Sequence, residues 1–393
     1  MFNYDVCVIG GCGRVGLPLS IAFADAGLKV VVYDTDKQKL KIVKDGIMPF
    51  KEEGCDAILK KVINNNLTPT DDPHLITGSK FLIVTIGTPV EEHLNPRYTE
   101  IFDFFKSISP YLADGQNIIL RSTVYPGTTR RLFDIFSKAK VKVKLSFCPE
   151  RIAEGKALHE LKALPQIISG FDDECVSEVA GLFKSLTDDI VIIDPTEAEL
   201  AKLFTNSWRY IQFAVVNQFY MIADKHGLDY SRIHNAMTYK YPRTNGIPTP
   251  GFAAGPCLFK DTMQLAAFND NAFYIGHSAM LINEWLPNYL VEKLKCSTDL
   301  SNKTVGILGL AFKAESDDER DSLSFKLKKL LETEAGSVLC SDPYIKKSCY
   351  IDADDLVKQS DIIIIATPHN IYRSLNIPVD KTLVDIWNIY KKP

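Results

Sequence analysis

Short runs of consecutive apolar residues recur along the first half of the chain, separated by stretches of helix length. The first run, Val6–Ile9, shows no alternation of apolar and polar positions, which is typical of a strand buried on both faces of a parallel sheet. A helical stretch covers 15–26, and further strand-like runs cover 29–33, 81–84, 117–120, 143–147 and 166–168. Strands that alternate with helices predict a doubly wound α/β domain, which we expect to end near Ile193.

A second alternation of the same kind begins at Lys303 and continues almost to the end of the chain. A helix is expected over 324–334, and strands are expected over 304–308, 337–340, 362–366 and 382–386. This part has Gly306 and Gly309 but no complete glycine-rich dinucleotide motif. It therefore predicts a second, smaller α/β domain with a different ligand.

A long helix is predicted between the two α/β parts. Its start is marked by a capping box, with Thr196 as N-cap and Glu199 three residues later, and we expect the helix to reach about His226. Its residues are apolar almost all round, so the helix should be buried in a core or between subunits. The chain thus predicts an α/β protein with two Rossmann-like doubly wound domains, 1–195 and 301–393, joined by a central helical domain, 196–300, with a long connecting helix.

Composition narrows the class of protein further. The 45 basic and 49 acidic residues give a net charge of −4 without long runs of one sign, which argues against a nucleic acid or a membrane surface as partner. Nine cysteines stand singly, without the Cys/His spacing of a metal site, which indicates free thiols in a reducing compartment. The longest aliphatic run, 362–366, is too short to span a membrane, and the N-terminus lacks signal-peptide features. We expect a cytoplasmic protein that binds small molecules and no metal.

A glycine-rich turn follows the first predicted strand. Gly11-Cys12-Gly13-Arg14-Val15-Gly16 fits the pattern GxGxxG between a strand and a helix, where glycines allow a tight turn and the helix N-terminus favours a pyrophosphate. Asp34 ends the second strand, eighteen residues after Gly16. A carboxylate there accepts hydrogen bonds from the adenosine ribose and repels a 2′-phosphate. The pattern predicts NAD rather than NADP as cofactor.

Candidate reactive residues lie in the central region. Cys257 ends a Gly/Pro-rich string four residues before Asp261, and a thiol in such a loop can form a covalent adduct with a carbonyl carbon. Lys202 and Asn206 lie one turn apart on the predicted helix and can together hold a sugar hydroxyl and stabilise an oxyanion. Asp261 can act as a base on water. Each residue also has a structural interpretation: a buried thiol, a solvated lysine beside a surface asparagine, and a capping aspartate.

These motifs, in order along nearly the whole chain, resemble the UDP-glucose/GDP-mannose dehydrogenase family, whose members oxidise a nucleotide sugar at C6 to its uronate. Matching segments are Val8–Pro18, Pro49–Glu52, Gly87–Pro89, Ser122–Thr128, Cys148–Gly155, Glu197–Asn206, Gly251–Asp261, Asn283–Pro287, Gly309–Lys313, Arg320 and Asp342-Pro343. The resemblance implies that Cys257 is the covalent nucleophile, assisted by Lys202, Asn206 and Asp261. It also implies that Thr123 and Glu150 line the reacting centre.

The same resemblance assigns residues to both ligands. Beside the glycine turn and Asp34, those implied for NAD are Lys39, Thr88, Ser122, Glu154 and Arg320. Those implied for a UDP-sugar are Glu150, Arg151, Lys202, Asn206, Gly251, Phe252, Phe312 and Lys313. Arg243 is similar to an arginine that family members contribute across a subunit boundary, so we expect a homodimer or higher homo-oligomer.

The chain departs from the family pattern at two places. Ala253-Ala254-Gly255-Pro256 stands where the family often has a Gly-Gly pair, and Pro256 has no backbone N–H to donate to an oxyanion. Arg14 stands where the glycine turn usually has an aromatic residue, and it would add a cation near the pyrophosphate. Both departures lie in segments assigned to ligands.

The resulting hypothesis is a four-electron oxidation that serves polysaccharide precursor synthesis. A C6 alcohol loses hydride to NAD⁺, Cys257 captures the aldehyde as a thiohemiacetal, a second NAD⁺ leaves a thioester, and water releases the carboxylate. Two alternatives stay open: a two-electron hydroxyacid-type dehydrogenase and a non-catalytic nucleotide-sugar-binding paralogue. The sugar is open between glucose and N-acetylhexosamines on UDP, GDP-mannose being disfavoured, and the string Pro256–Asp261 slightly favours the UDP-glucose branch.

Overall fold

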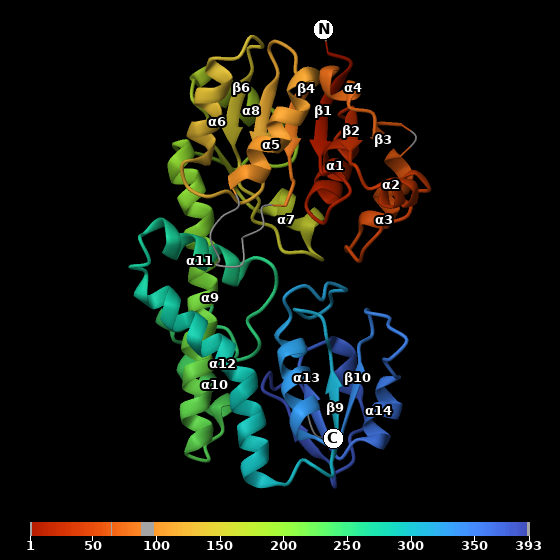
Figure 1. Cartoon of the computed structure of the whole chain (residues 1–393), viewed down its shortest axis with the longest axis vertical. Helices are drawn as coiled ribbons and strands as arrows, with labels where there is room; N and C mark the ends of the chain where they lie inside the picture. The colour runs from red at the N-terminus through yellow and green to blue at the C-terminus, as the bar shows by residue number, and fades with distance from the viewer. Residues whose placement is uncertain (1, 64, 88–97, 391–393) are drawn as a thin grey trace. The chain divides into compact units, whose positions relative to one another are not determined.

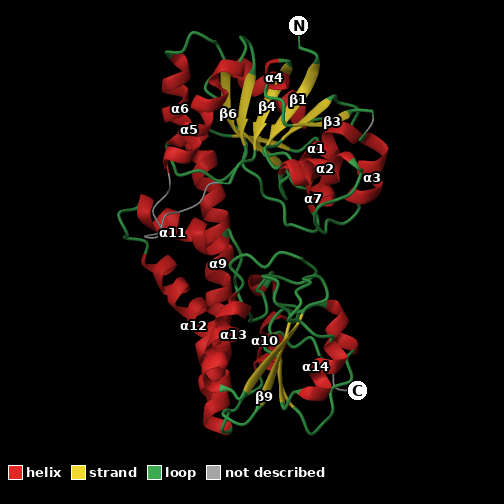
Figure 2. Ribbon diagram, turned by 45° about the vertical axis from the view of Figure 1, so that its right-hand side comes forward, coloured by secondary structure: helices red, strands yellow, loops and turns green. Residues whose placement is uncertain are grey.

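The computed structural model describes residues 2–63, 65–87 and 98–390 (Figure 1). The chain forms two compact units, Met1–Phe204 and Thr205–Pro393. Both are α/β structures, as predicted, and the second also contains the helices of the central region (Figure 2). The division at 195 and 300 into three domains stays a prediction.

The described part of the first unit is built on a six-stranded parallel sheet of order β3-β2-β1-β4-β5-β6. Its strands are β1 (Tyr4–Ile9), β2 (Val30–Tyr33), β3 (Leu67–Thr70), β4 (Ser79–Val84), β5 (Asn117–Leu120) and β6 (Lys144–Phe147). The order reverses between β1 and β4, and in open α/β sheets ligands bind at the carboxyl ends of the strands beside such a reversal. At this reversal the chain leaves the carboxyl end of β1 and enters the glycine turn.

Helices cover both faces of this sheet. They are α1 (Gly16–Asp25), α2 (Lys37–Lys44), α3 (Cys55–Val62), α4 (His74–Thr77), α5 (Tyr98–Ile108), α6 (Thr128–Ser137), α7 (Ala157–Ala163) and α8 (Asp173–Phe183), with a 3₁₀ turn at Ser109–Tyr111. Val6 and Val8 of β1 join a core with α1, α3 and α8, whereas Cys7 and Ile9 join a core with α5 and α6. The unbroken apolar run of β1 therefore serves two cores, as expected for a parallel strand.

Two strands differ from the prediction. β3 was not expected because its sequence Leu67-Thr68-Pro69-Thr70 has little apolar content, but it occupies an edge of the sheet, where a proline is tolerated. The predicted strand β7 (Gln166–Ile168) does not extend the main sheet. It pairs instead with β8 (Ile190–Ile192) in a separate two-stranded sheet.

The long helix α9 (Pro195–Lys225) ends where the pattern predicted, but its N-terminal cap differs. Asp194 accepts a hydrogen bond from the Thr196 N–H at 2.9 Å, and Glu197 accepts one from the Asp194 N–H at 3.0 Å. The capping box is therefore Asp194 with Glu197, and the prediction of Thr196 with Glu199 is wrong. A proline at the first helical position suits this earlier start.

Glu199 instead caps a different helix. Its buried carboxylate accepts hydrogen bonds from the Gly127 N–H at 2.6 Å, the Thr129 N–H at 2.8 Å and the Thr129 hydroxyl at 2.5 Å, at the N-terminus of α6. Burial raises the pKa of Glu199 despite these donors. This contact ties the first turns of α9 to the N-terminus of α6, on the carboxyl-end side of β5. Lys202 lies about one turn after Glu199 on α9.

The second unit continues with α10 (Tyr230–Thr238), α11 (Leu258–Phe268) and α12 (Tyr274–Ser297), and with a 3₁₀ turn at Pro242–Thr244. Its parallel sheet has the order β10-β9-β11-β12. The strands and helices of this sheet are β9 (Thr304–Leu308), β10 (Ser337–Ser341), β11 (Ile362–Ile365), β12 (Thr382–Val384), α13 (Leu323–Glu334) and α14 (Ala353–Gln359), with a 3₁₀ turn at Asn370–Ser374. The predicted second α/β domain is thereby confirmed.

The two faces of the second sheet are packed differently. Val305 and Ile307 contact a core shared with α12 and α13. On the other face a Cβ at Gly306 would overlap the Leu356 side chain, so this glycine lets α14 pack closely on β9. No helix among the described residues is both long and apolar enough to cross a membrane.

Candidate active site

The turn between β1 and α1 has the geometry that the glycine pattern requires. Gly10 has a φ of +75°. A Cβ at Gly11 would lie 2.6 Å from the Val8 carbonyl oxygen, and a Cβ at Gly16 would lie 2.6 Å from the Gly10 carbonyl oxygen. Side chains at both positions are excluded, which brings the N-terminus of α1 against the carboxyl end of β1. This cradle fits the pyrophosphate of a dinucleotide, whose negative charge the helix N-terminus favours.

Asp34 lies directly beside this turn. Its Oδ2 accepts a hydrogen bond from the Cys12 N–H at 2.9 Å, and its Oδ1 accepts one from the Asp36 N–H at 3.0 Å. Lys39, at the start of α2, places its Nζ 3.2 Å from Asp36 Oδ2. The predicted acidic and basic residues for the adenosine end of NAD are therefore brought together at the end of β2.

The other residues predicted for NAD in this unit follow the carboxyl ends of strands of the same sheet. The Arg14 guanidinium lies over the Phe50 ring, 5.0 Å from its centroid. The Ser122 hydroxyl donates to the Ile86 carbonyl at 2.5 Å, and Glu154 is half-buried. Thr88 lies outside the described residues, and its role stays a prediction.

A buried ion pair that sequence reasoning missed joins the ends of β5 and β6. Arg121 is fully buried, and its Nε and Nη2 lie 2.9 and 2.7 Å from Glu150 Oε2. Its Nη1 donates to the Cys148 carbonyl at 3.1 Å, its Nη2 donates to Gln166 Oε1 at 2.9 Å, and the guanidinium lies 4.8 Å from the Phe183 ring centre. The signal available in the sequence was a charged residue directly after the strand Asn117–Leu120.

The other carboxylate oxygen of Glu150 binds the backbone of the two residues that follow it. Oε1 accepts hydrogen bonds from the Arg151 and Ile152 N–H groups at 2.7 and 3.0 Å. The Arg151 guanidinium donates to the Pro165 carbonyl, and burial lowers its pKa. Both carboxylate oxygens of Glu150 are thus bound within the protein, so the geometry supports a structural role beside the reactive role predicted for it. Thr123, two residues after Arg121, is half-buried.

In the second unit the structure brings three predicted residues together. Cys257 is the N-cap residue of α11, and Asp261, one turn later, donates its N–H to the Cys257 carbonyl at 2.8 Å. Asp261 is fully buried, and its Oδ2 accepts a hydrogen bond from Asn206 Nδ2 at 2.6 Å. Asn206, which is also buried, is therefore not the surface asparagine of the structural interpretation. A thiolate at Cys257 would face the positive end of the α11 dipole.

Exposure separates Cys257 from most other cysteines. Six of the nine are buried, and burial raises the pKa of Cys12 and Cys148 to about 12 and that of Cys340 to about 11. The exposed ones are Cys257, Cys296 and Cys349. Cys296 lies in the last turn of α12, where the helix dipole disfavours a thiolate. Cys257 thus combines access with a helix N-terminus.

The loop before Cys257 packs against the segment after β9. The Gly255 N–H donates to the Asp321 carbonyl at 3.1 Å, and a Cβ at Gly255, whose φ is +98°, would overlap the Phe312 ring. Lys313 Nζ lies 5.7 Å from the centre of that ring. Phe312 and Lys313 therefore stand beside the Cys257 loop, and their contact with a UDP-sugar stays a prediction.

Arg320 is held on the same segment. Its Nε and Nη2 form a two-point pair with Asp318 at 2.5 to 3.0 Å, while more than half of its side chain stays exposed. Arg243 is exposed in the 3₁₀ turn after α10, with its Nη1 3.1 Å from the Tyr241 hydroxyl. Both guanidinium groups are thus presented at the surface of this unit.

Phe252 differs from the other residues predicted for the substrate. Its side chain is 4 % exposed and packs in the core formed by α12, α13 and β9. It therefore anchors the loop to the fold, and the substrate contact implied for this residue stays a prediction. Sequence reasoning could not separate the two roles, because an aromatic residue in a glycine-rich loop serves either.

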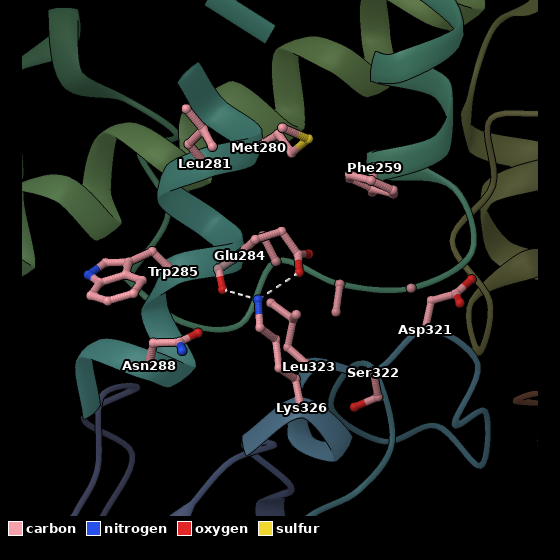
Figure 3. A pocket seen from close by; sticks show the side chains of 13 residues that line it. Phe259, Met280, Leu281, Glu284, Trp285, Asn288, Asp321, Ser322, Leu323 and Lys326 are labelled. Carbon is pink, nitrogen blue, oxygen red and sulfur yellow. Dashed lines mark hydrogen bonds and ion pairs between the residues drawn. The ribbon is translucent and has the colours of Figure 1, made fainter. Parts of the chain in front are cut away.

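A cavity of about 520 Å³ lies beside the same loop (Figure 3). Glu284 and Lys326 are in contact where they line it, with Lys326 Nζ 2.5 Å from the Glu284 carbonyl oxygen and 3.2 Å from its Oε2. The other lining residues are Ala253, Ala254, Gly255, Phe259, Met280, Leu281, Trp285, Asn288, Asp321, Ser322 and Leu323. None of these lining residues was assigned to a ligand from the sequence.

Three domain models of one protein family match the chain. They describe the NAD binding domain at residues 4–187, the central domain at 196–285 and the UDP binding domain at 306–392 of the UDP-glucose/GDP-mannose dehydrogenase family. The chain belongs to this family. The resemblance noted in the sequence, the fold and NAD as cofactor are thereby confirmed, and the protein is an NAD-dependent UDP-sugar dehydrogenase.

Individual relatives support the assignment over the full length. The UDP-N-acetyl-D-mannosamine dehydrogenase of Methanocaldococcus jannaschii is 31% identical over 395 residues, covering 98% of this chain and 89% of its own. The structure of the corresponding Pyrococcus horikoshii enzyme is 29% identical with a TM-score of 0.90, covering 99% of this chain and 96% of its own. A UDP-glucose dehydrogenase from Pyrobaculum islandicum is 24% identical with a TM-score of 0.87, covering 97% and 94%, and shows a shared fold.

Proposed function

We propose that the protein oxidises the C6 hydroxyl of a UDP-N-acetylhexosamine, with UDP-N-acetylmannosamine as first candidate, to the uronate in a four-electron reaction through Cys257. The arrangement of Cys257, Asp261 and Asn206 at the N-terminus of α11 carries the proposal. The relatives named above as UDP-N-acetyl-D-mannosamine dehydrogenases support the N-acetyl branch. We therefore replace the slight preference for UDP-glucose that the Pro256–Asp261 string suggested.

Each side chain has a definite task in this proposal. The Cys257 thiolate adds to the C6 aldehyde and forms a C–S bond, and protonation of the resulting oxyanion gives a thiohemiacetal. Asn206 uses one Nδ2 hydrogen on Asp261 and can donate the other to that oxyanion, together with the Lys202 ammonium. NAD⁺ at the glycine turn supplies the hydride acceptor for both oxidations.

Asp261 suits the final step. Its Oδ1 is buried and accepts no hydrogen bond from the described residues, and the Lys260 Nζ stands 3.6 Å away. A carboxylate oxygen of this kind can accept a proton from water as the water attacks the thioester carbon. The C–S bond then breaks, which releases the uronate and regenerates the Cys257 thiolate.

The second sheet supports a place for the UDP group. Phe312 and Lys313 follow the carboxyl end of β9, and β9 lies between β10 and β11, where the strand order reverses. Lys313 provides a cation for the UDP pyrophosphate on this segment, while Arg320 keeps the role toward NAD that the resemblance implies. We propose that this segment holds the nucleotide while the Cys257 loop faces the sugar.

A panel of UDP-sugars tests the function. We expect UDP-N-acetylmannosamine, compared with the UDP-linked forms of glucose, N-acetylglucosamine and N-acetylgalactosamine, to give the highest kcat/KM and two NADH per uronate, followed by NADH absorbance and product mass. One NADH per sugar with an aldehyde or ketone product would establish the two-electron alternative. Tight binding of a nucleotide sugar without NADH would establish the non-catalytic one.

We also propose that the protein is a homodimer joined through α9. Five large apolar side chains of this helix are between 42 % and 60 % exposed in the single chain, although the sequence predicted a helix buried all round. They are Phe204, Trp208, Val215, Phe219 and Ile222. Their spacings of four, seven, four and three residues place them on one side of the helix, which is typical of a helix that packs on a partner.

Sedimentation velocity at micromolar concentration measures this association. We expect a dimer, and we expect Trp208→Glu with Phe219→Glu to shift it to monomer, since charged residues on an apolar contact oppose association. A wild-type protein that sediments only as monomer would refute the dimer. The free cysteines fit our further proposal that the protein acts in the cytoplasm, in the supply of polysaccharide precursors.

A further inference from the structure

The side chain of one buried asparagine pairs with the whole backbone of Gly251, the first residue of the Cys257 loop. Asn217 Nδ2 donates to the Gly251 carbonyl at 3.0 Å, and the Gly251 N–H donates to Asn217 Oδ1 at 2.8 Å. Asn217 is fully buried on α9. Both backbone groups of Gly251 are therefore satisfied by one side chain, in the way that a neighbouring strand would satisfy them.

A second asparagine orients the first. Asn283 of α12 accepts the other Nδ2 hydrogen of Asn217 at its Oδ1, at 2.9 Å, and donates its own Nδ2 to the Tyr210 carbonyl at 3.0 Å. Both asparagines are fully buried. Since every donor of Asn217 is used, its amide has one orientation, and a satisfied buried network of this kind is rigid.

The far side of Gly251 is closed by an aromatic ring. A Cβ at Gly251 would overlap Trp387, whose indole N–H donates to the Ala366 carbonyl at 3.0 Å. Gly251 is thus held between α9 and the C-terminal segment. Together with the hydrogen bond from the Gly255 N–H to Asp321, this fixes the loop near both of its ends before Cys257.

The same helix face positions two parts of the site. Asn217 follows Asn206 by eleven residues, which is three helical turns, so both project from one side of α9, about 16 Å apart along its axis. Asn206 contacts Asp261 on α11, while Asn217 contacts the loop that leads into α11. α9 therefore contacts the chain on both sides of Cys257.

We propose that Asn217 and Asn283 are positioning residues that hold the Cys257 loop in register with Asn206 and Asp261. The inference rests on the function proposed for Cys257 but concerns residues that do not touch the reacting atoms. Without the pair, Gly251 loses its hydrogen-bond partners, and the loop no longer fixes the position of the Cys257 thiol at the N-terminus of α11. None of the residues in this network is assigned to NAD.

Asn217→Ala and Asn283→Ala test the proposal, with exposed Asn302→Ala as matched control. By amide exchange we expect the segment 249–256 to exchange at least about tenfold faster in both variants, as the loss of a buried hydrogen bond implies. We expect kcat for uronate to fall at least about tenfold, with the KM for NAD⁺ within about twofold. The control should match the parent protein in each respect.

Alkylation of Cys257, with Cys296 and Cys349 as references in the same digest, gives a readout that needs no turnover. We expect its rate relative to theirs to change in both asparagine variants. Unchanged exchange at 249–256, or an unchanged kcat in a folded variant, would overturn the proposal. Should Asn217→Ala not fold, Asn283→Ala decides, because it leaves both hydrogen bonds between Asn217 and Gly251 possible and removes the acceptor that orients Asn217. Four-electron turnover by a Cys257→Ser protein would refute the proposed function and leave the exchange result standing.

Discussion

Replacement of Cys257 by serine or alanine should reduce uronate formation about a thousandfold or more, as removal of a covalent nucleophile does in other enzymes. The reason is that a free aldehyde has no alcohol hydride left to give, whereas its thiohemiacetal has one. Initial oxidation of the C6 alcohol uses other groups, so a trace of NADH without uronate is expected. Quantification of uronate by mass spectrometry, beside NADH absorbance, measures the effect.

Cys296→Ser and Cys349→Ser provide the matched controls, because these thiols are also exposed. They should retain both turnover and the ratio of two NADH per uronate. Full four-electron turnover in the Cys257 variants would contradict the covalent mechanism. A uniform loss in the variants at all three cysteines would point to a general effect of thiol removal instead.

Substitution of Arg121 by methionine should destabilise the first unit by about 3 to 5 kcal/mol, because it leaves the Glu150 carboxylate buried without its ion pair. The carbonyl of Cys148 and the side chain of Gln166 lose donors as well. The effect should be measured as the free energy of opening of β5 and β6, from amide exchange under native conditions.

The double variant Arg121→Met with Glu150→Gln should recover part of this loss, since a neutral amide costs less to bury than an unpaired carboxylate. Exposed Arg232→Met should change the same free energy by less than about 0.5 kcal/mol. An Arg121→Met protein with parental protection at β5 and β6 would show that the pair contributes no net stability.

Most of the secondary structure and part of the site follow from local patterns. The run Val6–Ile9 predicted a strand with a core on each face, because each successive side chain of a strand points to the opposite side. The glycine turn and Asp34 were predictable because their spacing reflects one β–α–β unit. The relation of Cys257 to Asp261 was predictable too, because residues four apart in a helix lie one turn apart.

Contacts between segments distant in sequence were not predictable in this way. Four contacts join segments that no local sequence period relates. They are the capping of α6 by Glu199, the pairing of β7 with β8, the burial of Arg121 against Glu150, and the hydrogen bonds between Asn217 and Gly251. The apolar face of α9 shows the same limit, because composition indicates that a side chain is apolar but not which partner covers it.

The sequence by itself thus determined the strands and helices, the dinucleotide turn and the candidate nucleophile, since these depend on residues a few positions apart. Only the tertiary structure decided which carboxylates are buried, which thiols are accessible and what holds the Cys257 loop in place. The physical reason is that burial and long-range hydrogen bonding arise when distant segments pack, and the free energy of a polar group depends on the partners that it meets there.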